Sequence, residues 1–154
     1  MQDDKLVIVV EDDPNAVFLF ELALAQSGIS NPVRVLPSPD EALTYLKGQE
    51  PFTNRELFPL PALLFLNLDF PEDAAGHLVS SIRRTPGLES LLILGMSEVA
   101  DYQRKQYFFN LGLNACFLKQ RDIHQTVALI RKIDLLHEVL ENFQSTPSDK
   151  WSRD

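Results

Sequence analysis

The chain has 154 residues, 45% of them hydrophobic and 23% charged, which is typical of one globular domain and excludes a disordered segment. Its 14 Lys and Arg against 22 Asp and Glu leave a formal charge of -8, which disfavours contact with the phosphate backbone of nucleic acids. No apolar run approaches the ~20 residues of a membrane span, acidic residues follow Met1 where a secretory signal is basic, and a single cysteine excludes an intramolecular disulfide. We therefore expect a soluble cytoplasmic protein that binds neither nucleic acid nor a membrane.

Short apolar runs alternate with helix-start signals along the chain. Residues 5–10 form a continuous β-branched run, typical of a strand buried on both faces, and Asp13 followed by Pro14 predicts a helix directly after it. The pattern repeats, and the expected elements in chain order are a strand over 5–10, a helix over 14–28, a strand over 31–36, a helix over 39–48, a strand over 63–66, a helix over 75–84, a strand over 91–94, a helix from Ser97 to Phe109, a strand over 115–118 and a long helix from Asp122 to about Phe143.

Five strands alternating with five helices predict a doubly wound α/β fold with a five-stranded parallel sheet, because each parallel crossover requires a helix. Residues 49–60 are predicted to form an ordered surface loop. We expect one domain over residues 1–144, with an extended last helix, and a polar C-terminal tail over residues 145–154.

The polar residues that follow the strands are the candidate functional residues, because ligands in open α/β sheets bind at the carboxyl ends of the strands. Several carboxylates gathered near one lysine suit a hard cation such as Mg²⁺. The alternative is that the acids only solvate a loop and favour the positive end of the first helix. The candidates are Glu11, Asp12, Asp13, Asn67, Asp69, Gly95, Ser97 and Lys119.

At these positions the chain resembles the receiver domain of two-component response regulators. The likeness covers about residues 5–140 and rests on three motifs in order: the acidic cluster at 11–13, the stretch PALLFLNLDFP at 61–71, and the stretch GLNACFLK at 112–119. It is similar above all to the single-domain receivers that partner cyanobacterial phytochromes. The resemblance implies a flavodoxin-like fold with the strand order 2-1-3-4-5.

The resemblance also implies roles for individual residues. Active receivers use an aspartate at the end of the third strand as phosphoacceptor, acids after the first strand to hold Mg²⁺, and a lysine after the fifth strand to contact the phosphoryl group. The lysine is Lys119, and the acceptor position is Asn67, six residues after Pro61 and four before Pro71. Asp69 fits neither spacing.

The amide at position 67 changes the expected chemistry. A carboxylate attacks phosphorus, whereas the uncharged amide of Asn67 does not, so no acyl phosphate is expected there. The change also removes a cation ligand, and we expect Asp12 and Asp13, beside Glu11, to bind Mg²⁺ only weakly, with no cofactor required. Asn67 is instead expected to accept a hydrogen bond from Lys119.

Other positions of the phosphorylation switch differ as well. The resemblance places Gly95 where a small hydroxyl residue is usual, Cys116 at the switch aromatic, and Gln120 where a proline usually follows the lysine. Ser97 offers a hydroxyl two residues after Gly95, although a helix cap is the simpler role for it.

The last predicted helix suggests a partner surface. A helix of about 22 residues is about 33 Å long and is expected to extend beyond the sheet. Leu129, Leu135, Leu140 and Phe143 add apolar surface outside its core stripe. The resemblance points to a homodimer through the fourth helix, the fifth strand and the last helix.

We interpret the chain as a degenerate receiver that is not an enzyme and acts through contacts with a sensor histidine kinase or another signalling protein. One alternative is a receiver phosphorylated at a substitute acid, Asp69. An alternative from another class is a Mg²⁺-dependent hydrolase that uses Glu11, Asp12 and Asp13 together with Lys119.

Overall fold

The computed structural model describes residues 5–140, which contain five strands, six α-helices and one short 3-10 helix. Within these residues no helix is long and apolar enough to cross a membrane. The elements in chain order are β1 (Val7–Val10), α1 (Pro14–Gln26), β2 (Val33–Leu36), α2 (Pro39–Leu46), β3 (Leu63–Asn67), η1 (Pro71–Asp73), α3 (Ala74–Arg84), β4 (Leu92–Ser97), α4 (Tyr102–Leu111), β5 (Ala115–Leu118), α5 (Ile123–Lys132) and α6 (Asp134–Leu140).

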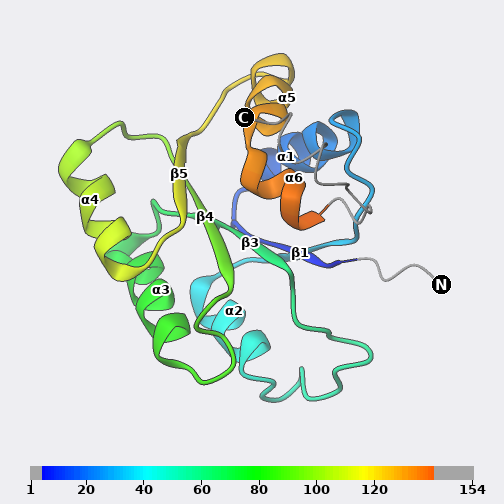
Figure 1. Cartoon of the computed structure of the whole chain (residues 1–154), viewed down its shortest axis with the longest axis vertical. Coiled ribbons are helices and arrows are strands. Elements are labelled where there is room, and N and C mark those ends of the chain that lie inside the picture. Colours follow the sequence, from blue (N-terminus) through cyan, green and yellow to red (C-terminus); the bar gives the residue numbers. More distant parts are fainter. Residues whose placement is uncertain (1–4, 141–154) are drawn as a thin grey trace, which may run out of the picture.

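The five strands form one parallel sheet in the order β2-β1-β3-β4-β5. Helices cover both faces of this sheet, with α1, α5 and α6 on one side and α2, α3 and α4 on the other (Figure 1). The predicted doubly wound α/β fold and its strand order are therefore confirmed. Because all strands run in the same direction, their carboxyl ends meet at one edge of the sheet.

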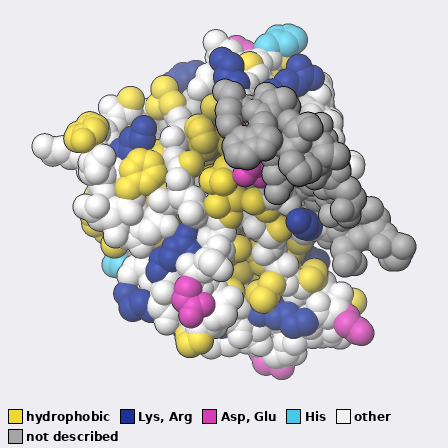
Figure 2. Space-filling model, viewed as in Figure 1, with side chains coloured by type: hydrophobic (Ala, Val, Ile, Leu, Met, Phe, Trp, Pro, Cys, Tyr) yellow, Lys and Arg dark blue, Asp and Glu magenta, His cyan; other side chains and the backbone are white. Residues whose placement is uncertain are grey.

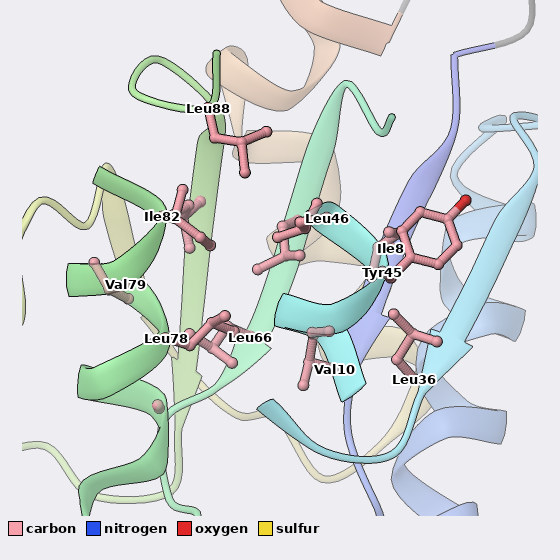
Figure 3. Packing of buried hydrophobic residues seen from close by; sticks show 14 of the residues in the cluster. Ile8, Val10, Leu36, Tyr45, Leu46, Leu66, Leu78, Val79, Ile82 and Leu88 are labelled. Carbon is pink, nitrogen blue, oxygen red and sulfur yellow. The ribbon is translucent and has the colours of Figure 1, made fainter. Parts of the chain in front are cut away.

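Two hydrophobic clusters hold the layers together, one on each face of the sheet. Successive strand residues point to opposite faces, so Ile8 contributes to one cluster and Val9 to the other. Figure 3 shows the cluster under α2 and α3, where Leu78 of α3 lies beside Leu66 of the central strand. Burial of both faces explains why β1 and β3 are continuous apolar runs rather than alternating ones.

The connection between α2 and β3, residues 47–62, contains no helix or strand. Arg55 anchors it to α2 by donating hydrogen bonds to the carbonyl oxygens of Tyr45 at 3.0 Å and Leu46 at 2.8 Å. The same guanidinium donates to the carbonyl of Phe58 at 3.1 Å. The connection is thus an ordered surface loop, and Arg55 ties it to carbonyl groups in the last turn of α2.

The prediction that the fourth helix begins at Ser97 was wrong. Ser97 is the last residue of β4, pairs with Leu118 and is 3% exposed. The helix begins at Tyr102, and its cap is Asp101, whose carboxylate accepts hydrogen bonds from the backbone of Gln103 and Arg104. The strand continues through the buried Met96 to Ser97, and its pairing with β5 holds the Ser97 side chain at the buried edge of the sheet.

The single long helix predicted from Asp122 was also wrong. The helix is interrupted at Ile133, where ψ is 90°, and the chain continues as the separate helix α6. This change of direction buries Leu136 and Leu140, at 0% and 3% exposure, in the cluster shared with α1 and α5. The described chain therefore folds back over the sheet instead of extending beyond it, and residues 141–154, including the predicted tail, lie outside the described residues.

Candidate functional site

Glu11, Asn67 and Lys119 meet at the carboxyl ends of β1, β3 and β5. The Nζ of Lys119 lies 2.9 Å from Oε1 of Glu11, and the Nδ2 of Asn67 donates to Oε2 of the same carboxylate at 3.2 Å. Glu11 is 7% exposed and Asn67 is 9% exposed. The sheet thus brings together three residues that lie far apart in the sequence, as their positions after the strands predicted.

The amide of Asn67 is fixed at both ends. Its Oδ1 accepts a hydrogen bond from the backbone N–H of Asp69 at 2.9 Å, while its Nδ2 faces Glu11. The opposite orientation of the amide would place two oxygens against each other at Glu11 and two donors against each other at Asp69. The expected hydrogen bond from Lys119 to Asn67 was wrong, because Lys119 donates to Glu11 instead.

The acidic residues after β1 have three different surroundings. Besides Lys119 and Asn67, Glu11 accepts hydrogen bonds from the backbone N–H groups of Asp12 at 3.1 Å and Asp13 at 3.2 Å. Asp13 caps α1 through the N–H of Asn15, as predicted, and Asp12 is exposed. Among residues 5–140 no group of three or more His, Cys, Asp or Glu side chains is arranged to hold a metal ion. A weak Mg²⁺ site at Asp12 and Asp13 stays a prediction.

Asp69 faces away from this cluster, toward β4 and α4. Its carboxylate accepts hydrogen bonds from the hydroxyl of Ser97 at 2.8 Å and the backbone N–H of Glu98 at 2.8 Å, and pairs with Arg104 at 2.9 Å. Partial burial alone raises the pKa of the Asp69 carboxyl, but these bonds and the nearby guanidinium outweigh it and hold the pKa below its ordinary value.

Arg104 is the centre of this second polar cluster, and sequence reasoning missed it. Its guanidinium also donates to the hydroxyl of Ser97 at 2.8 Å and to the carbonyl oxygen of Leu68. Arg104 lies on a helix whose sequence is polar on most positions, so no periodicity or spacing distinguishes it from neighbouring solvent-facing residues. Ser97 provides a hydroxyl at the sheet edge, but it binds Asp69 and Arg104.

Gly95 and Cys116 lie opposite each other in the pairing of β4 with β5. A Cβ at Gly95 would lie 2.8 Å from Cδ1 of Leu68 and 3.0 Å from Cδ2 of Leu113, so a side chain there would require the ends of these leucines to shift. Burial raises the pKa of the Cys116 thiol, and the nearby Lys105 only partly offsets this effect, which keeps the thiol neutral.

A pocket of about 540 Å³ opens beside Glu11, Asn67 and Lys119, on the face of the sheet that α1 and α5 cover. Its apolar wall includes Phe20 and Phe65, whose rings meet edge to face with centroids 4.6 Å apart. The sequence predicted the polar residues at its mouth, but not this wall, because strand and helix patterns do not show where two packed layers fail to fill the space between them.

The chain has similar proteins at the level of sequence and at the level of structure. No protein-family model matches the chain. An uncharacterised 14.6 kDa protein of Leptolyngbya boryana is 26% identical over 126 residues, which cover 82% of this chain and 87% of that protein.

Several solved structures share the fold. The response regulator RPA3017 in red light signalling of R. palustris superposes with a TM-score of 0.81 at 25% identity, covering 93% of this chain and 98% of the other. The bacteriophytochrome response regulator RtBRR superposes with a TM-score of 0.70 at 27% identity, covering 92% of this chain and 81% of the other. The phosphorylated cyanobacterial phytochrome response regulator RcpA superposes with a TM-score of 0.77 at 21% identity, covering 94% of this chain and 99% of the other. Receiver domains of response regulators, phytochrome-associated ones included, are thus the structural neighbours of this chain, and they support a role in two-component signalling.

Proposed function

We propose that this chain is a degenerate receiver in two-component signal transduction that acts through protein contacts without aspartyl phosphorylation. The observation that carries the proposal is Asn67, which ends β3 where the resemblance places the phosphoacceptor and whose amide binds Glu11 and the backbone of Asp69. Because that amide is uncharged and both its polar atoms are engaged, it offers no nucleophile to a phosphodonor.

The pairing of Lys119 supports the same proposal. In an active receiver this lysine contacts the phosphoryl group, whereas here its ammonium lies 2.9 Å from the buried carboxylate of Glu11. A net neutral pair has little attraction for either a phosphoryl group or a divalent cation. We therefore expect that no cofactor is required and that Mg²⁺ binds weakly.

The contacts of Asp69 favour this proposal over phosphorylation at a substitute acid. Its carboxylate has three partners, the Ser97 hydroxyl, the Glu98 N–H and the paired Arg104 guanidinium, and both of its oxygens are engaged. A phosphoryl group on Asp69 would have to displace these bonds. Arg104 also fixes α4 against the connection after β3 without any phosphoryl group, which suits a module that holds one conformation.

The proposed partners are a sensor kinase or another signalling protein and a second copy of this chain. A homodimer through α4, β5 and α5 is supported by exposed apolar side chains on α4, on β5 and in the connection that leads into α4. Val99 is 56% exposed, Tyr102 74% and Leu118 47%. Figure 2 shows hydrophobic side chains on the side where Figure 1 places α4 and β5, with Lys and Arg around them. Exposed apolar residues gathered in this way are typical of contact surfaces.

Incubation with Mg²⁺ and acetyl phosphate, followed by intact-mass measurement, tests the absence of phosphorylation. The phosphorylated phytochrome regulator RcpA provides the control for an active phosphodonor. We expect one added phosphoryl group on RcpA and none on this chain. An acid-stable, base-labile adduct on this chain would overturn the proposal, and peptide mapping would then begin at Asp69. Steady release of phosphate without an adduct would support the Mg²⁺-dependent hydrolase.

A further inference from the structure

The pocket beside Asn67 has the size and chemistry of a site for a small molecule. Its volume of about 540 Å³ lies within the range of ligand sites, roughly 300–1,000 Å³. Val9, Leu19, Phe20 and Phe65 form an apolar interior, and polar groups gather at the mouth where the strands end. This combination of an apolar interior and a few convergent polar groups is typical of small-molecule sites.

Two basic residues at the mouth, Lys119 and Arg121, keep open hydrogen-bond donors. Both carboxylate oxygens of Glu11 and both polar atoms of Asn67 are engaged. The ammonium of Lys119 has three N–H groups and makes a single bond, to Glu11, among the described residues. Arg121 also lines the pocket and makes no hydrogen bond or ion pair within residues 5–140.

The charges at the mouth limit the ligand further. Lys119 and Arg121 offer donors to an anionic group, but the exposed carboxylate of Glu98 also lines the pocket. A polyanion would meet this carboxylate as well as that of Glu11. A ligand with a single negative charge meets the guanidinium of Arg121, which pairs with no described residue, and the open N–H donors of Lys119, whose charge Glu11 already balances. Its remaining surface can turn toward the apolar interior.

We propose that this pocket binds a small amphipathic molecule with one anionic headgroup, held by Arg121 and Lys119, and an apolar or aromatic body that lies against Phe20 and Phe65. The occupied pocket would join α1 to the connection between β5 and α5. The site stands on the cavity and its open donors, independently of whether the chain is phosphorylated.

The probe is 8-anilinonaphthalene-1-sulfonate, which has an aromatic body and one sulfonate, compared with N-phenyl-1-naphthylamine, which has the same rings without the charge. Calorimetric and fluorescence titration of the full chain is expected to show that one molecule of the anionic probe binds per chain and that the binding saturates. The neutral probe is expected to bind more weakly. Arg121→Gln is expected to weaken the anionic probe about two- to fivefold and leave the neutral probe unchanged. Arg84→Gln, the same change at an exposed position of α3 that does not line the pocket, is the control.

A second pair of variants tests where the aromatic rings of the probes bind. Ala16 of α1 lines the pocket, and Ala16→Leu fills part of it, so both probes are expected to bind at least about fivefold more weakly. Ala25→Leu makes the same change at an exposed position of the same helix and is expected to have no effect. Thermal unfolding checks that both variants fold, and Arg121→Gln serves if Ala16→Leu does not. The proposal fails if neither probe saturates, if both Ala variants act alike, or if removal of the sulfonate does not weaken binding.

Discussion

The ammonium of Lys119 lies 2.9 Å from the carboxylate of Glu11, so the charges at the ends of β5 and β1 neutralise each other in a largely buried setting. Lys119→Met removes one partner and leaves Glu11 with only its hydrogen bonds from Asn67 and the backbone. We expect the free energy of unfolding to fall by about 2–4 kcal/mol in urea titrations at neutral pH, because a buried charge then lacks its counter-ion. The double variant Glu11→Gln/Lys119→Met is expected to regain much of the lost stability, because no buried charge then lacks a partner. An equal loss of stability in the double variant would contradict the pairing.

Asn67→Asp introduces a second carboxylate where an amide now donates to Glu11 at 3.2 Å. The lost hydrogen bond and the new repulsion are expected to lower the free energy of unfolding by about 1–3 kcal/mol without divalent cations. Millimolar Mg²⁺ is expected to restore part of the stability, as seen in thermal unfolding with and without the cation. Asn110→Asp, on the exposed side of α4, adds the same charge and is expected to show no Mg²⁺ effect.

Asp69→Asn tests the second polar cluster through pH. The pKa of Asp69 in the folded chain lies below its ordinary value of 3.8, so the unfolded chain takes up the proton first as the pH falls. The stability from Asp69 is therefore fully present above that ordinary value and is lost as the pH falls toward the folded pKa. We expect the variant to be less stable than the parent at neutral pH and the difference to shrink at about pH 3 in urea titrations. A constant difference would rule out the charge of Asp69 as its source, and Asp40→Asn at an exposed site is the control.

The packing of α6 is tested by two neighbouring leucines. Leu136 is 0% exposed and Leu135 is 37% exposed. Leu136→Ala is expected to lower the free energy of unfolding by about 2–5 kcal/mol, because it leaves a cavity in the cluster shared with α1 and α5. Leu135→Ala is expected to change it by no more than about 1 kcal/mol. Similar small effects for both would mean that α6 does not pack on the sheet in solution.

The proposed dimer is tested by placing a charge on its apolar face. Light scattering after gel filtration is expected to give the mass of two chains for the parent and of one chain for Tyr102→Asp, because a carboxylate on α4 would lose its water in the interface. Phe18→Asp changes a residue that is 69% exposed on α1, in the opposite layer, and is expected to remain dimeric. A monomeric parent chain would refute the dimer.

The sequence was sufficient to predict the sheet and the central cluster, but not the contacts within it. Continuous apolar runs located the strands, and their positions directly after parallel strands placed Glu11, Asn67 and Lys119 at one edge, while the strand order came from the family resemblance. Which of these side chains pairs with which depends on distances of a few tenths of an ångström, and the sequence pattern contains no such information. The break at Ile133 was missed for a related reason, since the apolar periodicity continues across it and only the packing of Leu136 against the sheet requires the turn.

The close packing at Gly95 limits which substitutions this edge of the sheet accepts. A site of the kind that the resemblance describes would combine a carboxylate at position 67 with a hydroxyl side chain at position 95, and that side chain would require the ends of Leu68 and Leu113 to shift. The first substitution conserves size but brings a second negative charge toward Glu11, whereas the second adds volume without charge. The two positions therefore set different demands, one electrostatic and one steric, on any variant that combines them.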